Sequence, residues 1–429
     1  MKWKRVALAD VTEYITDGDH QPAPKSNTGV LFIKIKDIQN NRVNLDNALY
    51  VPYEYYNRLP QNRKPLWGDT LYTVVGSYGI PAFVIDTPPF CFERNIALLH
   101  PNTSIIPQFL YYAVKNPIFY GQANNIANGS AQKLIPLSKL SGMKFDMPVS
   151  LEIQRQIVNV LEAYDNLIEN NQKQIKLLEE AAQRLYKEWF IDLRFPGYET
   201  TPVVDGVPEG WQKYHLKEVI DYEIGGGWGE ELPTDRYDCA AYVIRGTDLF
   251  DITHGNTLGI PFRYHSRSNL LARMLADGDI VFEVSGGSKT EGVARTALIR
   301  SSMLALWEKP AICASFCKLI RPVETRYSQF IFDTLQYMRF SGKTTEYDKR
   351  SASSIVNYRW KDFLSKETIV FPSDKVLKKY NLIAESTYQM MICKSISIEK
   401  AREARDRLLP KLMSGEIEVK LQRHKGVIP

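Results

Sequence analysis

The stretch "LEIQRQIVNVLEAYDNLIENNQKQIKLLEEAAQRLYKEWF", residues 151–190, predicts one unbroken helix of about forty residues. It contains neither proline nor glycine, and its apolar residues recur four and three positions apart. The repeating positions are Ile157, Leu161, Tyr164, Ile168, Asn171, Ile175, Leu178, Ala182, Leu185 and Trp189, and Asn171 interrupts this seam once. A helix of roughly 60 Å is longer than one small domain is wide, so it must connect separate parts of the chain.

A weaker seam of the same kind occupies residues 374–414. A shift of 223 residues aligns the two seams and places Asn171 over Lys394. One polar residue in an apolar seam fixes the register of paired helices at some cost in stability. We therefore expect the helices to pair antiparallel, with Asn171 beside Lys394 at the crossing, although two unpaired helices in separate places remain the alternative. Arg405 and Pro410 predict some irregularity in the second helix.

The repeat extends beyond the helices. "WKRVALADV" at 3–11 matches "WQKYHLKEV" at 211–219, and "GDTLYTVVGSYG" at 68–79 matches "GDIVFEVSGGSK" at 278–289. Short alternating runs separated by Gly, Pro and Asn turns predict strands in each copy, in a largely antiparallel or mixed sheet. The predicted fold class is α+β: two repeated mixed α/β domains joined by two long helices that form an antiparallel coiled coil, with pseudo-two-fold symmetry.

These patterns predict the domain boundaries. They are a first mixed domain at 1–150, a central long helix at 151–194, a linker and second mixed domain at 195–372, a C-terminal long helix at 373–417, and a tail at 418–429.

The composition narrows the class of protein. The 429 residues carry a formal net charge of +5, which permits a nucleic-acid partner without requiring one. The five cysteines lack Cys-x-x-Cys spacing, so neither a disulfide framework nor a zinc site is indicated. The sequence has no run of eighteen apolar residues and no signal peptide. We therefore expect a cytoplasmic protein without a membrane partner.

Motifs for catalysis are sparse. The sequence contains no GxxxxGK[ST] phosphate loop, and "GGGWG" at 225–229 lacks the spacing of a dinucleotide-binding loop. None of the six histidines pairs with another at metal-ligand spacing. We predict binding rather than turnover, with no catalytic and no metal-binding residues. Two alternatives stay open: a DNA methyltransferase or nuclease with its own catalytic site, and a coiled-coil adaptor that binds only proteins.

The duplicated arrangement resembles the specificity (S) subunit of type I restriction-modification enzymes across nearly the whole chain. The resemblance is carried by Trp3, Leu8 and Val11, by "ITDGDHQPAP" at 15–24, by "GDTLYTVVGSYG", and by Pro148, Gln154, Ile157 and Leu161 leading into the long helix. The second half departs from this pattern, because "IGGGWGEELP" at 224–233 replaces the "DGDH" segment.

This resemblance implies a non-catalytic DNA-binding subunit. Its two target recognition domains would read the two halves of a split double-stranded DNA site, and its helices would space them and carry methyltransferase (M) subunits. The implied partners are two M subunits, which use S-adenosylmethionine, and restriction (R) subunits, which use ATP and magnesium. No cofactor is expected in this chain itself.

Candidate DNA-reading residues follow from the chemistry of DNA contacts, in which Lys and Arg bind phosphates while Arg, Lys, Asn and Gln read base edges. Residues 1–150 contain 15 Lys and Arg against 11 Asp and Glu, whereas residues 206–372 contain 21 of each. The second domain must therefore segregate its charges or bind weakly. Polar residues in the glycine-containing turns are the candidates, with solvated turns as the alternative: Ser77, Tyr78, Asn128, Gln132 and Lys133, and by repeat equivalence Ser285, Ser288, Lys289, Lys343, Thr344, Lys349, Arg350 and Ser351.

Overall fold

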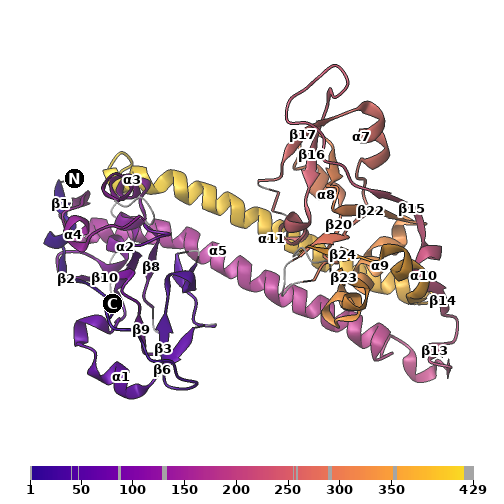
Figure 1. Ribbon diagram of the computed structural model, residues 1–429, viewed down its shortest axis with the longest axis horizontal. Helices are drawn as coiled ribbons and strands as arrows, with labels where there is room; N and C mark the ends of the chain where they lie inside the picture. Colours follow the sequence, from indigo (N-terminus) through magenta and orange to yellow (C-terminus); the bar gives the residue numbers. More distant parts are fainter. Residues whose placement is uncertain are drawn as a thin grey trace, which may run out of the picture. The chain divides into compact units, whose positions relative to one another are not determined.

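The computed structural model describes two compact units. One comprises Met1–Leu167 with Ala401–Pro429, and the other comprises Ile168–Lys400. Each unit contains one mixed domain and one part of both long helices (Figure 1). The described residues are 2–39, 41–46, 48–85, 88–127, 133–254, 256–257, 259–287, 292–350 and 355–419.

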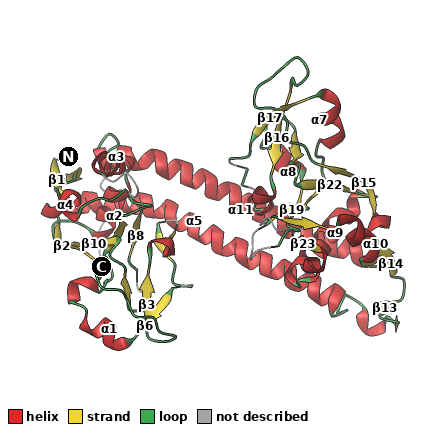
Figure 2. Cartoon of the chain, in the orientation of Figure 1, coloured by secondary structure: helices red, strands yellow, loops and turns green. Residues whose placement is uncertain are grey.

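The first mixed domain is built on two small sheets (Figure 2). Four antiparallel strands lie in the order β2 (Thr12–Asp17), β10 (Ile96–Pro101), β7 (Thr70–Thr73) and β8 (Pro81–Phe83). In the other sheet, β3 (Val30–Ile33) pairs antiparallel with β6 (Leu49–Val51) and parallel with β9 (Phe90–Phe92). Two ribbons complete it: β1 (Trp3–Ala7) with β11 (Lys144–Pro148), and β4 (Ile38–Gln39) with β5 (Arg42–Val43). Its helices are α1 (Tyr53–Arg58), α2 (Pro107–Lys115), α3 (Pro117–Ile126) and α4 (Leu137–Ser141).

The second mixed domain repeats this topology. Its four-stranded sheet has the order β15 (Ile220–Gly225), β22 (Cys317–Pro322), β18 (Ile280–Glu283) and β20 (Thr296–Leu298). β16 (Cys239–Ile244) pairs antiparallel with β17 (Phe262–His265) and parallel with β21 (Ala311–Cys313), and β14 (Gln212–His215) pairs with β25 (Thr368–Phe371). The matching strand orders confirm the predicted duplication of a mixed α/β fold.

The second unit contains a further small sheet, a ribbon and the helices of its mixed domain. A third small sheet has the order β19 (Ser285–Gly286), β24 (Val356–Tyr358) and β23 (Asp348–Arg350), and a ribbon joins β12 (Val203–Val204) to β13 (Val207–Pro208). The helices of the second domain are α6 (Leu249–Thr253), α7 (Arg267–Arg273), α8 (Ser301–Leu304), α9 (Ser328–Phe340) and α10 (Trp360–Lys366).

A buried aspartate begins the same strand in both domains. Asp69, just before β7, accepts a backbone N–H from three residues earlier and contacts His100 at 2.6 Å. Asp279, just before β18, accepts the equivalent N–H and binds the guanidinium of Arg321 at 2.7 and 2.8 Å. Because a buried carboxylate must be hydrogen-bonded, each copy supplies a basic partner from the neighbouring strand. The aspartate of the "GD" motif therefore has the same role in both halves, a buried carboxylate bound to a basic side chain of the neighbouring strand.

Two long helices run through both units. α5 spans Leu151–Tyr186 and continues as a wider turn over Lys187–Ile191, and α11 spans Asp374–Ser414 without a break at Pro410. In the first unit, Ile157 and Leu161 share a core with Leu409 and Leu412. In the second unit, the ring of Trp189 lies 6.0 Å from that of Tyr380. The beginning of α5 therefore packs on the end of α11, and the end of α5 on its beginning, as the predicted antiparallel pairing requires.

A charged cluster joins the helices to the first domain. Arg405 of α11 binds Asp165 of α5 at 2.5 Å, and Asp165 also accepts a hydrogen bond from Tyr112 at 2.7 Å and contacts Lys115 at 3.6 Å. Burial alone would raise the pKa of Asp165, but Lys115, Tyr112 and Arg405 together hold that pKa below its ordinary value. Burial lowers the pKa of Lys115 to about 8 despite the nearby carboxylate. The polar Arg405 in the seam is thus satisfied by Asp165 rather than disrupting the helix.

The interruption at Asn171 also has a partner. Asn171 is buried, and its Nδ2 donates a hydrogen bond to Oγ of Ser397 at 3.2 Å within the second unit. Ser397 follows Lys394 by three residues, about one helical turn. The observed partner is therefore displaced from the predicted one by about a turn, and direct contact between Asn171 and Lys394 stays a prediction.

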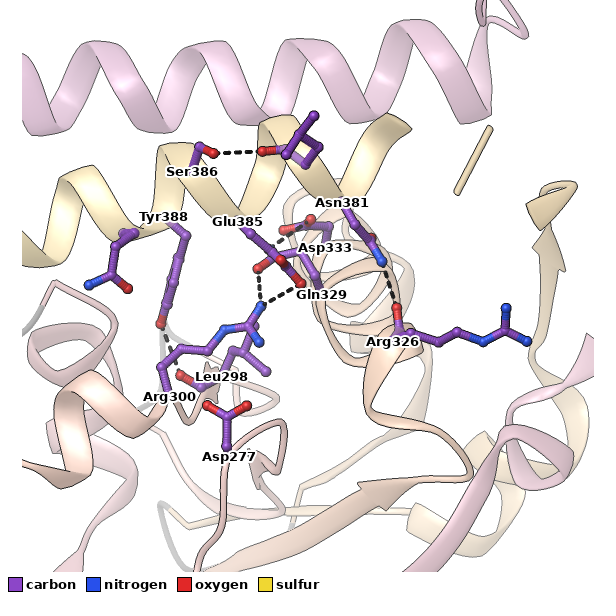
Figure 3. Close-up of polar contacts among 12 residues, drawn as sticks. Asp277, Leu298, Arg300, Arg326, Gln329, Asp333, Asn381, Glu385, Ser386 and Tyr388 are labelled. Carbon is purple, nitrogen blue, oxygen red and sulfur yellow. Dashed lines mark hydrogen bonds and ion pairs between the residues drawn. The ribbon is translucent and has the colours of Figure 1, made fainter. Parts of the chain in front are cut away.

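Polar side chains of α11 hold the second domain (Figure 3). Tyr380 donates to Asp333 of α9 at 2.7 Å, and Tyr388 donates to the carbonyl of Leu298 at 3.0 Å. Arg300 contacts Glu385 of α11 at 3.4 Å. Burial raises the pKa of Asp333 to about 6, even though the hydrogen bond from Tyr380 favours the charged form. The hydrogen bonds of Tyr380 and Tyr388 thus connect α11 with both a helix and a strand of this domain.

A histidine ties the second domain to α5. The imidazole Nε2 of His254 lies 2.7 Å from Glu179 Oε1, and Nδ1 lies 2.6 Å from the carbonyl oxygen of Phe250. Both partner atoms are acceptors, so both ring nitrogens must carry protons to make these hydrogen bonds. Burial alone would lower the pKa of His254, but Glu179 and the Phe250 carbonyl raise that pKa above its ordinary value. The two acceptors around the ring and the raised pKa both favour the protonated form of His254.

Within the part of the chain that the structure describes, no helix combines the length and the apolar character needed to cross a membrane.

Candidate nucleic-acid interface

One end of the four-stranded sheet gathers several loops of the first domain. In its antiparallel register Ile96 pairs with Thr73, and Ala97 pairs with Asp17. The segments that follow β2 and β7 and precede β10 therefore emerge at the same end. The Val74 N–H donates to the carbonyl of Asn95 at 3.0 Å, which joins two of these segments directly. We call this end the first rim, comprising residues 18–25, 34, 74–79, 93–95 and 133–135.

The structure brings together the two predicted loops of the first rim. The Gly76 N–H donates to the Lys133 carbonyl at 3.0 Å, and Lys133 Nζ lies 5.9 Å from the centre of the Tyr78 ring. Tyr78 donates to Asn124 Oδ1 at 2.6 Å and stacks at 6.1 Å on Tyr120. Ser77 is exposed beside them. Tyr78 is therefore a fixed ring that supports an exposed cation.

A glycine makes this turn possible. Gly79 has a φ of +85°, and a Cβ at this position would lie 2.6 Å from the ring of Tyr120. Any other residue would be strained and would push the ring away. The predicted candidates Asn128 and Gln132 lie outside the described residues.

The equivalent end of the second domain forms a second rim. Glu283, at the end of β18, pairs with Cys317 at the start of β22, and the Val284 N–H donates to the Phe316 carbonyl at 2.9 Å. We define the second rim as residues 226–228, 284–287, 314–316, 348–350 and 356–357. Both rims follow the same strands, as the repeat predicts.

Three predicted residues of the second rim lie on one small sheet. Ser285 is paired with Asn357 and donates to its Oδ1 at 2.9 Å, while Lys349 on β23 pairs with the other side of Asn357. Lys349 and the adjacent Arg350 are both exposed. Ser288, Lys289 and Ser351 lie outside the described residues.

Two other candidates are placed less favourably for DNA contact. Thr344 is 2% exposed, and Lys343 binds Glu367 at 2.5 Å. The repeat alignment offered no way to see this burial, because the segment after α9 differs in length and sequence between the copies. The roles of Lys343 and Thr344 in reading DNA stay predictions, and the burial of Thr344 argues against its role.

The second rim is stiffened by a buried ion pair. Arg295 donates to both oxygens of Glu283 at 2.8 and 2.6 Å, and Glu283 is 1% exposed. A Cβ on Gly246 would lie 2.4 Å from this carboxylate, so glycine there allows close approach. Two parallel hydrogen bonds of this kind fix the orientation of Glu283, and so the direction of the chain that follows β18.

The two rims differ in the side chains that they expose. The second rim carries Trp228, which is 42% exposed, and Phe316, which is 56% exposed. The Arg263 guanidinium lies 5.0 Å from the Trp228 ring. A guanidinium held beside an exposed ring is well placed to bind a backbone phosphate. Sequence analysis missed both aromatic residues, because the two copies carry different residues here: Phe316 stands at the place of Asn95 in the equivalent turn, and the segment that contains Trp228 replaces the "DGDH" segment.

Sequence analysis also missed part of the first rim. Arg94 and Asn95 form the turn between β9 and β10, and Lys34 follows β3. The parallel pairing of Ile33 with Phe92 brings Lys34 next to that turn across about sixty residues of sequence. The short polar turn "ERN" between two apolar strands could have identified Arg94 and Asn95 as candidates. The parallel strand pairing that brings Lys34 to this turn could not be predicted from the sequence.

Among the described residues, no three His, Cys, Asp or Glu side chains gather in a group that could hold a metal ion.

Comparisons with known proteins agree with this architecture. Residues 1–180 match the family model described as type I restriction modification DNA specificity domain. The chain is 25% identical to the type I restriction enzyme MjaIX specificity subunit of Methanocaldococcus jannaschii, over 76% of this chain and 72% of the relative. It is 22% identical to the HindI specificity subunit of Haemophilus influenzae, over 97% and 99% of the two chains.

A solved structure shares the fold over nearly the full length. The crystal structure of the type I restriction-modification S subunit from M. genitalium superposes with a TM-score of 0.58 at 14% sequence identity, covering 96% of each chain. The duplicated domains, the paired helices and the matches in sequence all point the same way: the chain is similar to the specificity subunits of type I restriction-modification enzymes, and its residues 1–180 match the DNA specificity domain of that family.

Proposed function

We propose that this chain reads a two-part DNA target, with one mixed domain at each half of the site. The first rim would contact one half-site through Ser77, Tyr78 and Lys133. The second rim would contact the other through Ser285, Lys349 and Arg350. The domains proposed for these roles are residues 1–150 and 195–372.

The observation that carries the proposal is the equivalence of the two rims. Both lie at the same end of sheets with the same strand order, and both combine glycine turns with exposed Lys or Arg. Cations supply affinity for the phosphate backbone, while side chains at base edges supply sequence specificity. Two equivalent readers in one chain suit a target with two separated halves.

The paired helices would act as a spacer and as a docking site. We propose that α5 and α11 set the distance between half-sites at about one turn of DNA, centre to centre. They would also carry two methyltransferase subunits, which use S-adenosylmethionine. Restriction subunits that use ATP and magnesium would complete the assembly, so this chain itself would need no cofactor.

An electrophoretic shift assay at two salt concentrations tests the proposal. The full chain is mixed with duplex DNA, with and without its methyltransferase subunits. We expect the assembly to bind DNA with an affinity that falls steeply as salt rises, because phosphate contacts release counterions. An assembly whose DNA binding is absent or independent of salt would contradict the proposal.

A further inference from the structure

The first rim contains a cavity that none of the predicted reading residues lines. It has a volume of about 350 Å³ and lies between the loop after β2 and the turn before β10. Its lining includes Lys25, Lys34, Arg94, Asn95 and the half-exposed ring of Tyr50. All of these residues belong to the first domain.

The acidic side chains near this cavity are already engaged. Arg63 contacts Asp17 at 3.5 Å and Asp19 at 3.3 Å, and Tyr55 donates a further hydrogen bond to Asp19 at 3.1 Å. Glu93 Oε1 accepts the N–H of Ile35 at 2.7 Å. Asp19 and Glu93, which line the cavity, thus already accept hydrogen bonds from the chain.

The basic side chains are not engaged in the same way. Within the described part of the chain, no ion pair joins Lys25, Lys34 or Arg94 to a carboxylate. Lys25 and Arg94 are exposed, and Lys34 is half-buried. The cavity therefore offers hydrogen-bond donors and positive charge to a ligand rich in acceptors.

The loop that closes the cavity is held rigidly. A Cβ on Gly18 would lie 2.1 Å from the carbonyl oxygen of Phe92, so only glycine allows the loop to approach this strand. Directly after it, Asp19 forms a parallel bridge with Glu93. A lining fixed before the ligand arrives loses little entropy on binding.

We propose that this cavity holds an acceptor-rich group of the first half-site, with Lys25, Lys34 and Arg94 as donors. Two parts of DNA have this chemistry: the O6 and N7 atoms of a guanine edge, and the oxygens of a backbone phosphate. The inference rests on the function proposed above and adds a contact site to it.

The test uses the full chain assembled with its methyltransferase subunits. The methylation motif is first determined in DNA from cells that carry the wild-type assembly, and absence of any two-part motif would count against the proposed function itself. The motif and DNA affinity are then measured for Arg94→Ala, Arg94→Lys and the combined substitution of Lys25, Lys34 and Arg94 by Ala. Lys139→Ala is the matched control. Lys139 lies on α4, and the chain just after α4 is hydrogen-bonded to the segment ahead of β2, because the Met143 carbonyl accepts the Leu8 N–H there. This segment lies at the end of β2 away from the rim.

Two results support the inference and separate its sources. If the cavity reads guanine, both Arg94 variants lose roughly 5- to 150-fold in discrimination at one position of the first half-site, and the second half-site is unchanged. If the cavity holds phosphate, Arg94→Lys keeps the motif. In that case the combined variant weakens binding to all sequences and reduces the salt slope by about 2 to 3.

One result overturns the inference. The inference fails if the Arg94 variants keep the wild-type motif and the combined variant keeps the wild-type salt slope. Both results are what we expect of the control, Lys139→Ala. Should the combined variant fail to fold, which circular dichroism would show, Lys25→Ala and Arg94→Lys alter only exposed side chains. Their motifs and salt slopes then decide the question.

Discussion

Replacing Asp165 by Asn tests how the long helices are held to the first domain. The carboxylate of Asp165 is 22% exposed, and its partners Arg405 and Lys115 are 14% and 9% exposed. Removing one member of a buried pair typically costs 3–5 kcal/mol, because the remaining charges stay desolvated. Partial exposure reduces this cost through solvent screening, so we expect about 2–4 kcal/mol for Asp165→Asn.

Hydrogen exchange measured by mass spectrometry follows this loss locally. A loss of about 2–4 kcal/mol corresponds to roughly 30- to 1000-fold faster exchange in α2 and in the α11 residues after Lys400. Peptides of the second unit should change little. Asp406→Asn is the control, because Asp406 also contacts Arg405, at 2.8 Å, but is 60% exposed. Equal exchange in Asp165→Asn and Asp406→Asn would refute the reasoning.

Three further predictions concern pH, salt and length. Since the pKa of His254 is raised, its contribution to stability is complete below about pH 6.5 and is lost as the pH rises through the folded-state pKa. His254→Gln should therefore destabilise the chain more at pH 6 than at pH 8.5, and an equal loss in thermal melts at both values would contradict this. Lys133→Ala and Arg350→Ala should each weaken DNA binding and lower the salt slope by about 1, and unchanged slopes would remove these residues from the rims. Inserting one heptad into both α5 and α11 lengthens each helix by about 10 Å, so the recognised half-sites should move apart by about 3 base pairs. An unchanged spacing between the half-sites would contradict the proposed role of the helices as a spacer.

The sequence was sufficient to predict the long helices and the duplication. Apolar residues three and four positions apart from Ile157 to Trp189 indicate a helix and no other element. Two halves with similar sequences must have similar topology. The register of the two paired helices was harder to predict from the sequence. Asn171 donates a hydrogen bond to Ser397, about one turn from Lys394, and the exact register of two packed helices depends on the fit of their side chains, which residue spacing does not encode.

Parts of the candidate interface were also beyond the sequence. Ser77, Tyr78 and Lys133 could be selected from glycine turns, and the structure brings them together. Lys34 and Arg94 meet only because β3 and β9 pair in parallel across a long sequence separation. Such long-range pairing determines which turns share one end of a sheet, and no local pattern reports it.

The methylation motif in DNA from cells carrying this gene and its partner subunits tests the central claim most directly. Two reading domains predict a motif of two specified halves separated by base pairs of any sequence. Exchanging the first domain for that of a relative should change one half and preserve the other. A single continuous motif, or a domain exchange that alters both halves, would contradict the account.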